Sequence, residues 1–326
     1  MKTITNLGTP MTVPAYDMNW LMKDEQDKKT IHVAGIGRVG STLLMGLKLL
    51  GRRELKEIGL FDLNDNTCLR WEMELNQVME GCSEEPSPEV KILTDEALFD
   101  CDVFMFCIAR AVPEISDKKI DVRLAQLEAN GAIVRAYAKK AADRGFKGLF
   151  VVVSDPVDLL CREAFAASQE GAHPFHPYQV TGLGLGVMNA RAAYYAKKEG
   201  LPRYLTEGRV FGPHGAMLVV ADSLDENHYS EGDSDRLQKL TTMANMAMRE
   251  LGHLPYTAPA LSSGAYTILR ILRGEWNYSA NYLNGVYFGA KNRSAGDHVE
   301  WENEPLPDKL FAKLETVYAS LRDFRA

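Results

Sequence analysis

Three basic side chains and one carboxylate have types that suit the reduction of a small carbonyl acid. Arg123 opens an expected helix, Arg191 lies early in another, His214 stands between a proline and a glycine, and Asp155 ends an apolar run. One arginine can bind a carboxylate through two parallel hydrogen bonds, and another can polarise a carbonyl as negative charge develops on its oxygen. A histidine can donate or accept the proton near neutral pH. Each residue alone is typical of a helix start or a turn, so this interpretation needs a scaffold that brings them together.

A glycine-rich turn provides the clearest cofactor motif. An apolar run over 31–34 leads into the spacing G-x-G-x-x-G, and a helix is expected over 42–50. In this context Gly35 allows the tight turn, Gly37 allows close approach of a pyrophosphate, and Gly40 allows close packing of helix on strand. The helix N-terminus offers free N–H groups to the phosphates. The residues expected to hold a dinucleotide here are Gly35, Ile36, Gly37, Arg38, Val39 and Gly40.

A carboxylate after the second apolar run indicates which dinucleotide is bound. The run over 58–61 ends at Asp62, about 20 residues after the third glycine, where an acid accepts hydrogen bonds from the adenosine ribose. Because this carboxylate would repel a 2′-phosphate, we predict NAD rather than NADP. A glycine-rich turn by itself is a weak signal, and the second strand with its acid is what favours the cofactor interpretation.

Composition and charge narrow the class of protein. The 326 residues are 46% hydrophobic and 25% charged, as in ordinary globular chains with room for two domains. The net charge of −7 gives no reason to expect nucleic acid, and no apolar run is long enough for a membrane span. The five cysteines form no C-x-x-C pair and the N-terminus leads into no signal-peptide core, so we expect a cytoplasmic protein without disulfides or zinc. His173 and His176 lie among prolines with no acid or cysteine nearby, and we expect no metal there.

The elements that must position these residues follow an α/β pattern. Apolar runs alternate with helical periodicity between 31 and 154, which indicates a Rossmann-type, doubly wound parallel sheet with helices on both faces. Ligands of such sheets bind beyond the carboxyl ends of the strands, so the glycine turn, the loop after Ile108 and the segment 154–155 should share a crevice. The expected strands are 31–34, 58–61, 90–93, 102–108 and 148–153, and a long helix is expected over 123–144.

After Pro156 the pattern changes to that of an α+β substrate domain. In the stretch 234–251, Met243, Met248 and other apolar side chains keep helical spacing, and we expect them to fill the core. Residues 1–29 show no periodicity and indicate a solvated arm, or alternatively one that crosses a subunit boundary. The expected helices are 156–168, 188–199, 234–251, 258–273 and 306–324, with strands at 210–212 and 217–220. The domain prediction is a 1–29 arm, a 30–155 NAD-binding domain and a 156–326 substrate domain.

Several segments, in order, resemble the L-lactate and malate dehydrogenase family from about residue 31 to 324. Besides the glycine turn and Asp62 they are Trp71–Leu75, Arg123 with Asn130, Val151–Asp158, Ala190–Arg191, Gly212–Gly215 and Tyr256–Thr257. The resemblance implies an NAD-dependent enzyme that interconverts a 2-oxo acid and an L-2-hydroxy acid, acting as a homodimer or homotetramer.

The resemblance also implies a role for each site residue. Arg191 would bind the substrate carboxylate, Arg123 would polarise the carbonyl, and His214 would protonate the carbonyl oxygen, while the nicotinamide supplies the hydride. Thr257 would shape the substrate pocket. The residues implied to contact the cofactor, in addition to the glycine turn, are Arg110, Asn130 and Val153.

Two departures from the family bear on mechanism and substrate. The family orients its histidine with an aspartate three positions before the arginine, where this chain has Met188, and the asparagine of the family's S-N-P segment is Asp155. One hypothesis is that Asp155 supplies the missing negative charge and raises the pKa of His214; the alternative is that it receives a cationic or hydroxylated group of the substrate. The loop after the fourth strand is long and carries Lys118 and Lys119, so we expect a larger or polar 2-oxo acid rather than plain pyruvate or oxaloacetate.

Two other functions stay open at this point. Met188 and Asp155 are compatible with an NAD-binding protein of little dehydrogenase activity that acts as a sensor or interaction module. Asp155 is also compatible with reductive amination of a keto acid, where it would hold an amine.

Overall fold

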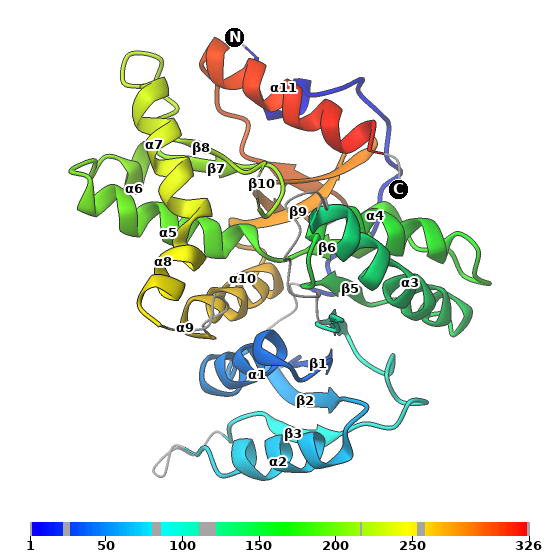
Figure 1. The fold of residues 1–326 in the computed structure, drawn as a ribbon. Helices are drawn as coiled ribbons and strands as arrows, with labels where there is room; N and C mark the ends of the chain where they lie inside the picture. The colour runs from blue at the N-terminus through cyan, green and yellow to red at the C-terminus, as the bar shows by residue number, and fades with distance from the viewer. Residues whose placement is uncertain are drawn as a thin grey trace.

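Nine strands form one sheet in the computed structural model, which describes residues 2–21, 27–79, 86–110, 122–215, 217–252 and 258–324. Six parallel strands stand in the order β3-β2-β1-β4-β5-β6, and β9, β10 and β11 continue the sheet antiparallel (Figure 1). This parallel order is that of the doubly wound dinucleotide-binding fold, so the predicted fold class is confirmed. The strands are β1 Lys29–Ala34, β2 Leu55–Phe61, β3 Glu89–Ile92, β4 Val103–Phe106, β5 Leu149–Val152, β6 Val180–Gly182, β9 Asn277–Leu283, β10 Val286–Ser294 and β11 Val299–Trp301.

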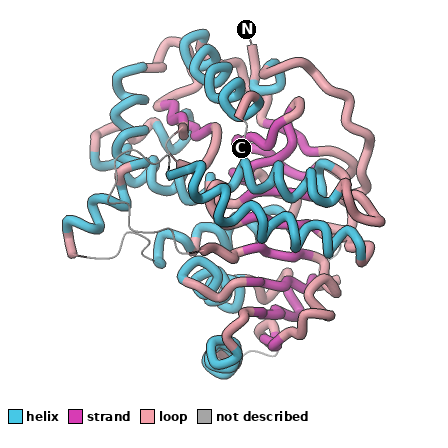
Figure 2. Tube along the Cα trace, turned by 45° about the vertical axis from the view of Figure 1, so that its right-hand side comes forward, coloured by secondary structure: helices cyan, strands magenta, loops and turns pink. Residues whose placement is uncertain are grey.

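Helices flank the stacked strands, as Figure 2 shows. A separate antiparallel pair, β7 (Arg209–Phe211) and β8 (Val219–Ala221), lies on the C-terminal side. Short 3₁₀ turns occur at Ile4–Asn6 and Pro177–Gln179. The helices are α1 Arg38–Leu50, α2 Asp65–Asn76, α3 Val122–Asp143, α4 Val157–Ser168, α5 Leu185–Lys198, α6 Tyr204–Glu207, α7 Glu231–Thr242, α8 Ala244–Glu250, α9 Ala258–Leu261, α10 Ser263–Leu272 and α11 Asp308–Arg322.

The central strands form because their apolar runs are buried on both faces of the sheet. Every residue of β4 and β5 is buried, and Phe104, Phe106 and Phe150 are completely inaccessible. Continuous apolar runs of this kind are typical of parallel sheets covered by helices. All five strands expected between 31 and 153 are present, with ends shifted by a few residues. The helix expected over 42–50 begins earlier, at Arg38, directly after the glycine turn.

Two glycines let the cofactor-side helix α1 pack closely on α10. A Cβ atom at Gly46 would lie 2.6 Å from Cβ of Ala265, and one at Gly264 would lie 2.8 Å from Cδ2 of Leu43. Helix axes approach this closely only where a side chain is missing. The contact brings helix α10 of the C-terminal half against α1, the helix that follows the cofactor turn.

The single helix expected over 234–251 is wrong in two respects. The structure divides it at Met243 into α7 and α8. The expected core role also fails, because Met243 is 49% exposed, Met246 43% and Leu251 69%, whereas Leu237 is fully buried. The helical spacing of α7 is interrupted at Met243. The apolar residues of α8 therefore do not lie on the same face as the buried residues of α7.

The solvated arm expected over residues 1–29 is also wrong for the part that the structure describes. Ile4, Leu7, Met18 and Leu21 are buried in the core of the same chain. Tyr16 stacks on the ring of His176 at 4.7 Å and donates its hydroxyl to the carbonyl of residue 147. Burial raises the pKa of the Tyr16 phenol to about 12, with the charge of the neighbouring residue 17 adding to the shift. The arm therefore contacts both halves of the sheet: Tyr16 donates its hydroxyl to residue 147, before β5, and its backbone N–H to residue 297, between β10 and β11.

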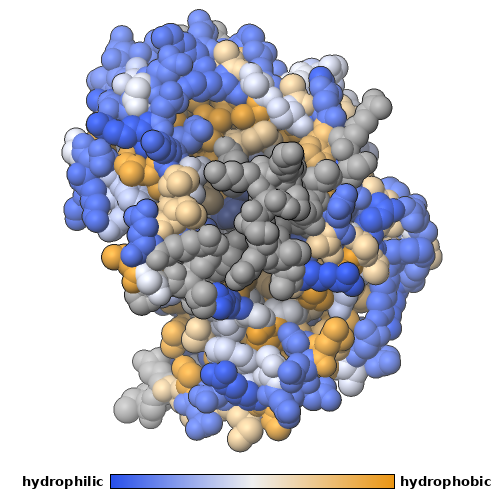
Figure 3. All heavy atoms as spheres, viewed as in Figure 1, coloured by the Kyte–Doolittle hydropathy of each residue, from blue (hydrophilic) through white to orange (hydrophobic). Residues whose placement is uncertain are grey.

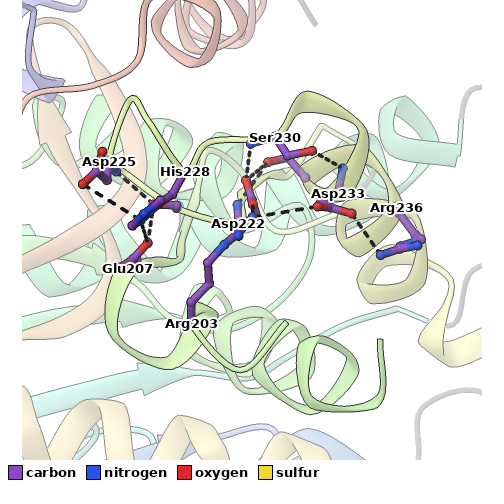
Figure 4. A network of polar contacts seen from close by, with 10 residues as sticks. Arg203, Glu207, Asp222, Asp225, His228, Ser230, Asp233 and Arg236 are labelled. Carbon is purple, nitrogen blue, oxygen red and sulfur yellow. Dashed lines mark hydrogen bonds and ion pairs between the residues drawn. The ribbon is translucent and has the colours of Figure 1, made fainter. Parts of the chain in front are cut away.

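A polar network joins α6, the turn after β8 and the start of α7 (Figure 4). The carboxylate of Asp222 is fully buried; its Oδ1 accepts from the backbone N–H of Ser230 and the hydroxyl of Ser234, both at 2.9 Å, and its Oδ2 pairs with Arg203. The side chain of Ser230 caps α7. The turn after β8 is thus fixed by one buried charge.

The surface is predominantly hydrophilic with scattered apolar patches on the face shown in Figure 3. None of the helices in the described part of the chain has both the length and the apolar character to cross a membrane.

Candidate functional site

A pocket lies where the carboxyl ends of the parallel strands meet the C-terminal helices. It brings together five of the residues singled out in the sequence, which come from the glycine turn, the end of β5, α5 and the turn after β7. The pocket is lined by Val39, Leu43, Val153, Asp155, Val157, Leu183, Gly184, Val187, Arg191, His214, Asn245, Leu261 and Gly264. Its walls are thus mostly apolar, with a few convergent polar groups, as in sites for small ligands.

The glycine turn fits a dinucleotide phosphate. Gly35 has φ +91°, and a Cβ there would lie 2.7 Å from the backbone N of Ile108, while a Cβ at Gly40 would lie 2.0 Å from the carbonyl oxygen of Gly35. The chain itself therefore requires glycine at both positions. A Cβ at Gly37 would meet nothing within 4 Å. Because Gly37 is the N-cap of α1 and has no side chain to cap it, this open space adjoins unpaired N–H groups, which is the environment that a phosphate needs.

Asp62 lies beside this turn, as the sequence predicts. Its Oδ2 accepts from the backbone N–H of Ile36 at 2.8 Å, and its Oδ1 accepts from that of Asn64 at 3.0 Å. Each carboxylate oxygen can accept more than one hydrogen bond, so the group remains able to receive ribose hydroxyls. These residues could hold the NAD that the sequence predicts.

Asn130 ties together the ends of β4 and β5. Its side chain is buried; Oδ1 accepts from the N–H of Arg110 at 2.9 Å and Nδ2 donates to the carbonyl of Asp155 at 2.8 Å. The hydroxyl of Ser154 donates to the carbonyl of Ile108 at 2.7 Å. These bonds fix the backbone that carries Asp155. The Arg110 side chain is exposed, and its cofactor contact, like that of Asn130, stays a prediction.

Arg191 enters the pocket from the second turn of α5. Its Nη2 donates to Oδ1 of Asn245 at 3.0 Å, and its Nη1 points to the sulfur of Met188 at 3.8 Å. Burial lowers the pKa of the guanidinium from its ordinary value, and the nearby Tyr195 and Asp155 oppose the shift. The group nevertheless stays charged, because arginine is not deprotonated in proteins. A partly buried cation held by a neutral amide is suited to binding a carboxylate.

His214 is held with its two ring nitrogens in different surroundings. Its backbone N–H donates to Oδ2 of Asp158 at 3.2 Å, which fixes the turn. Its Nδ1 is buried without a hydrogen-bond partner in the described chain and lies against Gly184, the N-cap of α5. Its Nε2 lies 4.0 Å from Oδ1 of Asp155. A Cβ at Gly184 would lie 2.9 Å from Nδ1, so the glycine is what allows the ring to sit there.

The position of Asp155 bears on both hypotheses raised by the sequence. The family orients its histidine with an aspartate at the position of Met188, whereas Asp155 lies 4.0 Å from Nε2 of His214 and not at the buried Nδ1. Met188, one turn before Arg191 in α5, is buried and directs its sulfur to the arginine. Asp155 and His214 therefore line the same pocket, with the carboxylate facing Nε2.

Three of the expected site features fall outside the described part. Arg123 lies in the first turn of α3, but its side chain is not among the described ones. Thr257, Lys118 and Lys119 all lie outside the described residues. Their roles therefore remain predictions.

Asn245 is a pocket residue that the sequence did not reveal. It stands among methionines and alanines in a stretch with helical spacing, so the apolar pattern of its neighbours conceals it. The signal available was its polarity: a lone amide in an otherwise apolar segment needs a partner if buried. Arg191 is that partner.

His176 and the described cysteines lie outside the pocket, and none of them is part of a metal-binding group. Nε2 of His176 lies 3.0 Å from the carbonyl of Pro14 and its Nδ1 accepts from the N–H of Tyr178, so both nitrogens are engaged. No group of three metal-binding side chains occurs within the ranges described. Four cysteines there are free thiols, namely Cys68, Cys101, Cys107 and Cys161.

Comparison with known proteins agrees with this geometry. Residues 29–174 match the family model of the lactate/malate dehydrogenase NAD-binding domain. An L-lactate dehydrogenase 2 of Staphylococcus aureus is 26% identical over 329 residues, covering 90% of this chain and 97% of that protein. An L-lactate dehydrogenase of Treponema denticola is 29% identical over 201 residues, covering 61% of this chain and 59% of that protein.

Solved structures share the fold at lower identity. A lactate dehydrogenase from a Medee basin deep-sea metagenome superposes with a TM-score of 0.73 at 19% identity, and the malate dehydrogenase of Archaeoglobus fulgidus, solved with NADH, does so with 0.70 at 19%. Both comparisons cover 90% of this chain and 97% of the other. Residues 29–174 therefore match the NAD-binding domain of the lactate/malate dehydrogenases, and the chain as a whole shares their fold.

Proposed function

We propose that the protein is an NAD-dependent oxidoreductase that reduces a 2-oxo acid to its L-2-hydroxy acid, reversibly. The match of residues 29–174 to the NAD-binding domain of lactate/malate dehydrogenases, and the similarity to L-lactate dehydrogenases over 90% of the chain, support the dehydrogenase class and the cofactor. The observation that carries the proposal is the convergence of Arg191, His214 and Asp155 in one pocket with Val39 of the glycine turn. This is the set of groups that a small oxo acid beside a nicotinamide needs.

Each pocket residue has a distinct task in this reaction. NADH, when bound, supplies the hydride to the carbonyl carbon. Arg191 holds the substrate carboxylate, and Asn245 fixes the guanidinium for that purpose. His214 donates the proton to the carbonyl oxygen through Nε2, since Nδ1 is buried and Nε2 faces the pocket residue Asp155. Arg123 is proposed to polarise the carbonyl, and Thr257 to shape the pocket.

The charge of the pocket argues against a dicarboxylic substrate. Among the pocket residues that the structure describes, Arg191 is the arginine available to the carboxylate on C1, and Asp155 adds a negative charge 4.0 Å from Nε2 of His214. A second substrate carboxylate near Asp155 would be repelled, because like charges a few ångströms apart in a partly desolvated pocket interact strongly. The pocket thus favours a monocarboxylic 2-oxo acid with a polar side chain over oxaloacetate.

A second candidate function rests on the unpartnered Nδ1 of His214. An imidazolium there lacks the carboxylate that would stabilise it, so the protein could bind NAD without turnover and act as a sensor or interaction module. A cytoplasmic location and a homodimer or homotetramer stay predictions. The division of the chain into an arm (1–29), an NAD-binding domain (30–155) and a substrate domain (156–326) also stays a prediction.

Loss of NADH absorbance over a panel of monocarboxylic and dicarboxylic 2-oxo acids tests the proposal. We expect turnover with monocarboxylic acids, and a His214→Asn variant should lose at least about a hundredfold in kcat while NADH still binds. NADH binding without turnover of any acid would favour the sensor instead. The exposed His298→Gln variant is a matched control that should turn over normally.

A further inference from the structure

Asp155 presents an unused hydrogen-bond acceptor to the pocket. No hydrogen bond from the described chain reaches its carboxylate, and its side chain is 40% exposed, whereas its backbone is fixed by Asn130. Its nearest charged neighbour, Nε2 of His214, lies 4.0 Å away, which is beyond hydrogen-bond distance. Its backbone is fixed at the pocket wall, and its carboxylate accepts no hydrogen bond from the described residues, so it is placed to receive one from a ligand.

The surroundings of the histidine ring fix which nitrogen carries its proton. Nδ1 lies against Gly184, where the N-terminus of α5 places the positive end of the helix dipole. That end disfavours a proton on Nδ1, and no acceptor is present there. The proton of the ring therefore lies on Nε2, the nitrogen that faces Asp155.

The reacting carbonyl cannot be the partner of Asp155. A carbonyl oxygen and a carboxylate are both acceptors, so they repel each other, whereas the Nε2–H of His214 suits the carbonyl. A donor that binds Asp155 must belong to another group of the substrate. Because Oδ1 is only 4.0 Å from the nitrogen that binds the carbonyl oxygen, this donor lies on the carbon next to the carbonyl.

We infer that the substrate is a 3-hydroxy-2-oxo acid whose C3 hydroxyl donates to Asp155 while its C2 carbonyl accepts from His214. This inference rests on the proposed function and specifies its substrate class. Arg191 holds the C1 carboxylate, so three consecutive carbons each have a polar partner. Asp155 is the specificity-determining residue, and the proton delivered to the C2 oxygen still comes from Nε2.

Two substrates of the same shape test the inference. Hydroxypyruvate has a hydroxyl where 2-oxobutyrate has a methyl group, and only the former can donate to Asp155. We expect the wild-type enzyme to favour hydroxypyruvate by at least about tenfold in kcat/KM, as for a hydrogen bond to a charged acceptor. In Asp155→Asn the ratio should fall at least about fivefold. Asp297→Asn removes an exposed carboxylate of the same charge and should leave the ratio unchanged.

The outcomes separate this inference from the proposed function. NADH consumption with both acids at equal kcat/KM overturns the inference and leaves the reductase intact. Turnover that requires added ammonium also overturns it, because the donor would then be a nitrogen on C2. Consumption of neither acid, nor of any other 2-oxo acid, overturns the proposed function itself. If Asp155→Asn does not fold, as judged by thermal unfolding, the wild-type ratio alone decides.

Discussion

At the residue scale, the three glycines of the cofactor turn are present for two different reasons. Gly35 and Gly40 are required by the chain, because their Cβ atoms would collide with backbone atoms at 2.7 and 2.0 Å. Gly37 is not, since a methyl group there would meet nothing. A residue kept small beside open space at a helix N-terminus is explained by a ligand that occupies that space.

Gly37→Ala should therefore weaken NADH binding without destabilising the fold. We expect the dissociation constant to rise at least about tenfold, because the methyl group takes the place of a phosphate contact worth more than about 1.4 kcal/mol. Titration of NADH fluorescence and thermal unfolding measure the two effects. Gly40→Ala is the contrasting variant, which should lower the melting temperature strongly. Unchanged NADH affinity in Gly37→Ala would refute the phosphate assignment.

The residue types predicted which side chains line the pocket, but not how the imidazole of His214 is oriented in it. His214, Arg191 and Asp155 could be found because each follows a strand or opens a helix at the ligand-binding edge. The sequence could not predict which nitrogen of the His214 ring faces Asp155. That orientation depends on the packing of Nδ1 against Gly184, which has no side chain to block the ring. Asn245 was hidden by apolar neighbours, and its bond to Arg191 joins α8 to α5, a contact between distant segments that no local pattern reveals.

At the element scale, two of the strands that the sequence did not reveal, β9 and β10, contain several buried polar side chains. β9 and β10 contain Asn277, Ser279, Asn281 and Asn292, all buried, which obscure the apolar alternation. Their side chains satisfy one another: Nδ2 of Asn281 donates to Oδ1 of Asn292 at 2.9 Å, and the hydroxyl of Ser279 donates to Oδ1 of Asn277 at 2.8 Å. Polarity read along the chain cannot reveal a partner on a neighbouring strand.

The turn between β8 and α7 depends on the buried carboxylate of Asp222 (Figure 4). In Asp222→Asn an amide can keep one oxygen towards Ser230 and Ser234, but its NH₂ group then faces the guanidinium of Arg203, and two donors oppose each other. We expect a loss of about 2 kcal/mol in the free energy of unfolding. Urea denaturation at neutral pH measures it.

Asp233→Asn is the matched control for this prediction. Asp233 also lies near Arg203, at 3.8 Å, but its side chain is 30% exposed. A partly solvated ion pair contributes at most about 1 kcal/mol. Equal losses in the two variants would mean that the network, rather than the buried charge of Asp222, stabilises the turn.

At the scale of the whole molecule, one sheet extends from the cofactor half to the C-terminal half, and the N-terminal arm crosses back over it. The backbone N–H groups of Tyr16 and Met18 donate to the carbonyls of Asp297 and Gly296, and Asn284 donates to the carbonyl of Leu7. Such contacts between distant segments cannot be predicted from a local pattern, which is why the arm seemed solvated in the sequence. Because the arm and the sheet bury histidines together, the stability of the whole molecule depends on their protonation.

His32 makes this dependence testable. It is buried in β1, and its ring Nδ1 lies 2.9 Å from the carbonyl of Leu98. Burial lowers its pKa from the ordinary 6.5, although the Leu98 carbonyl and nearby acids oppose the shift; burial also lowers the pKa of His176. Below pH 6.5 the unfolded chain therefore binds protons that the folded chain rejects, so the free energy of unfolding should fall as the pH drops from 7 to 5, by at most about 1.4 kcal/mol per pH unit for each histidine. Urea denaturation at several pH values measures this slope, and His32→Gln should make it less steep. His298→Gln, at a solvated histidine, is the control and should leave the slope unchanged. An unaltered slope in His32→Gln would contradict the assignment.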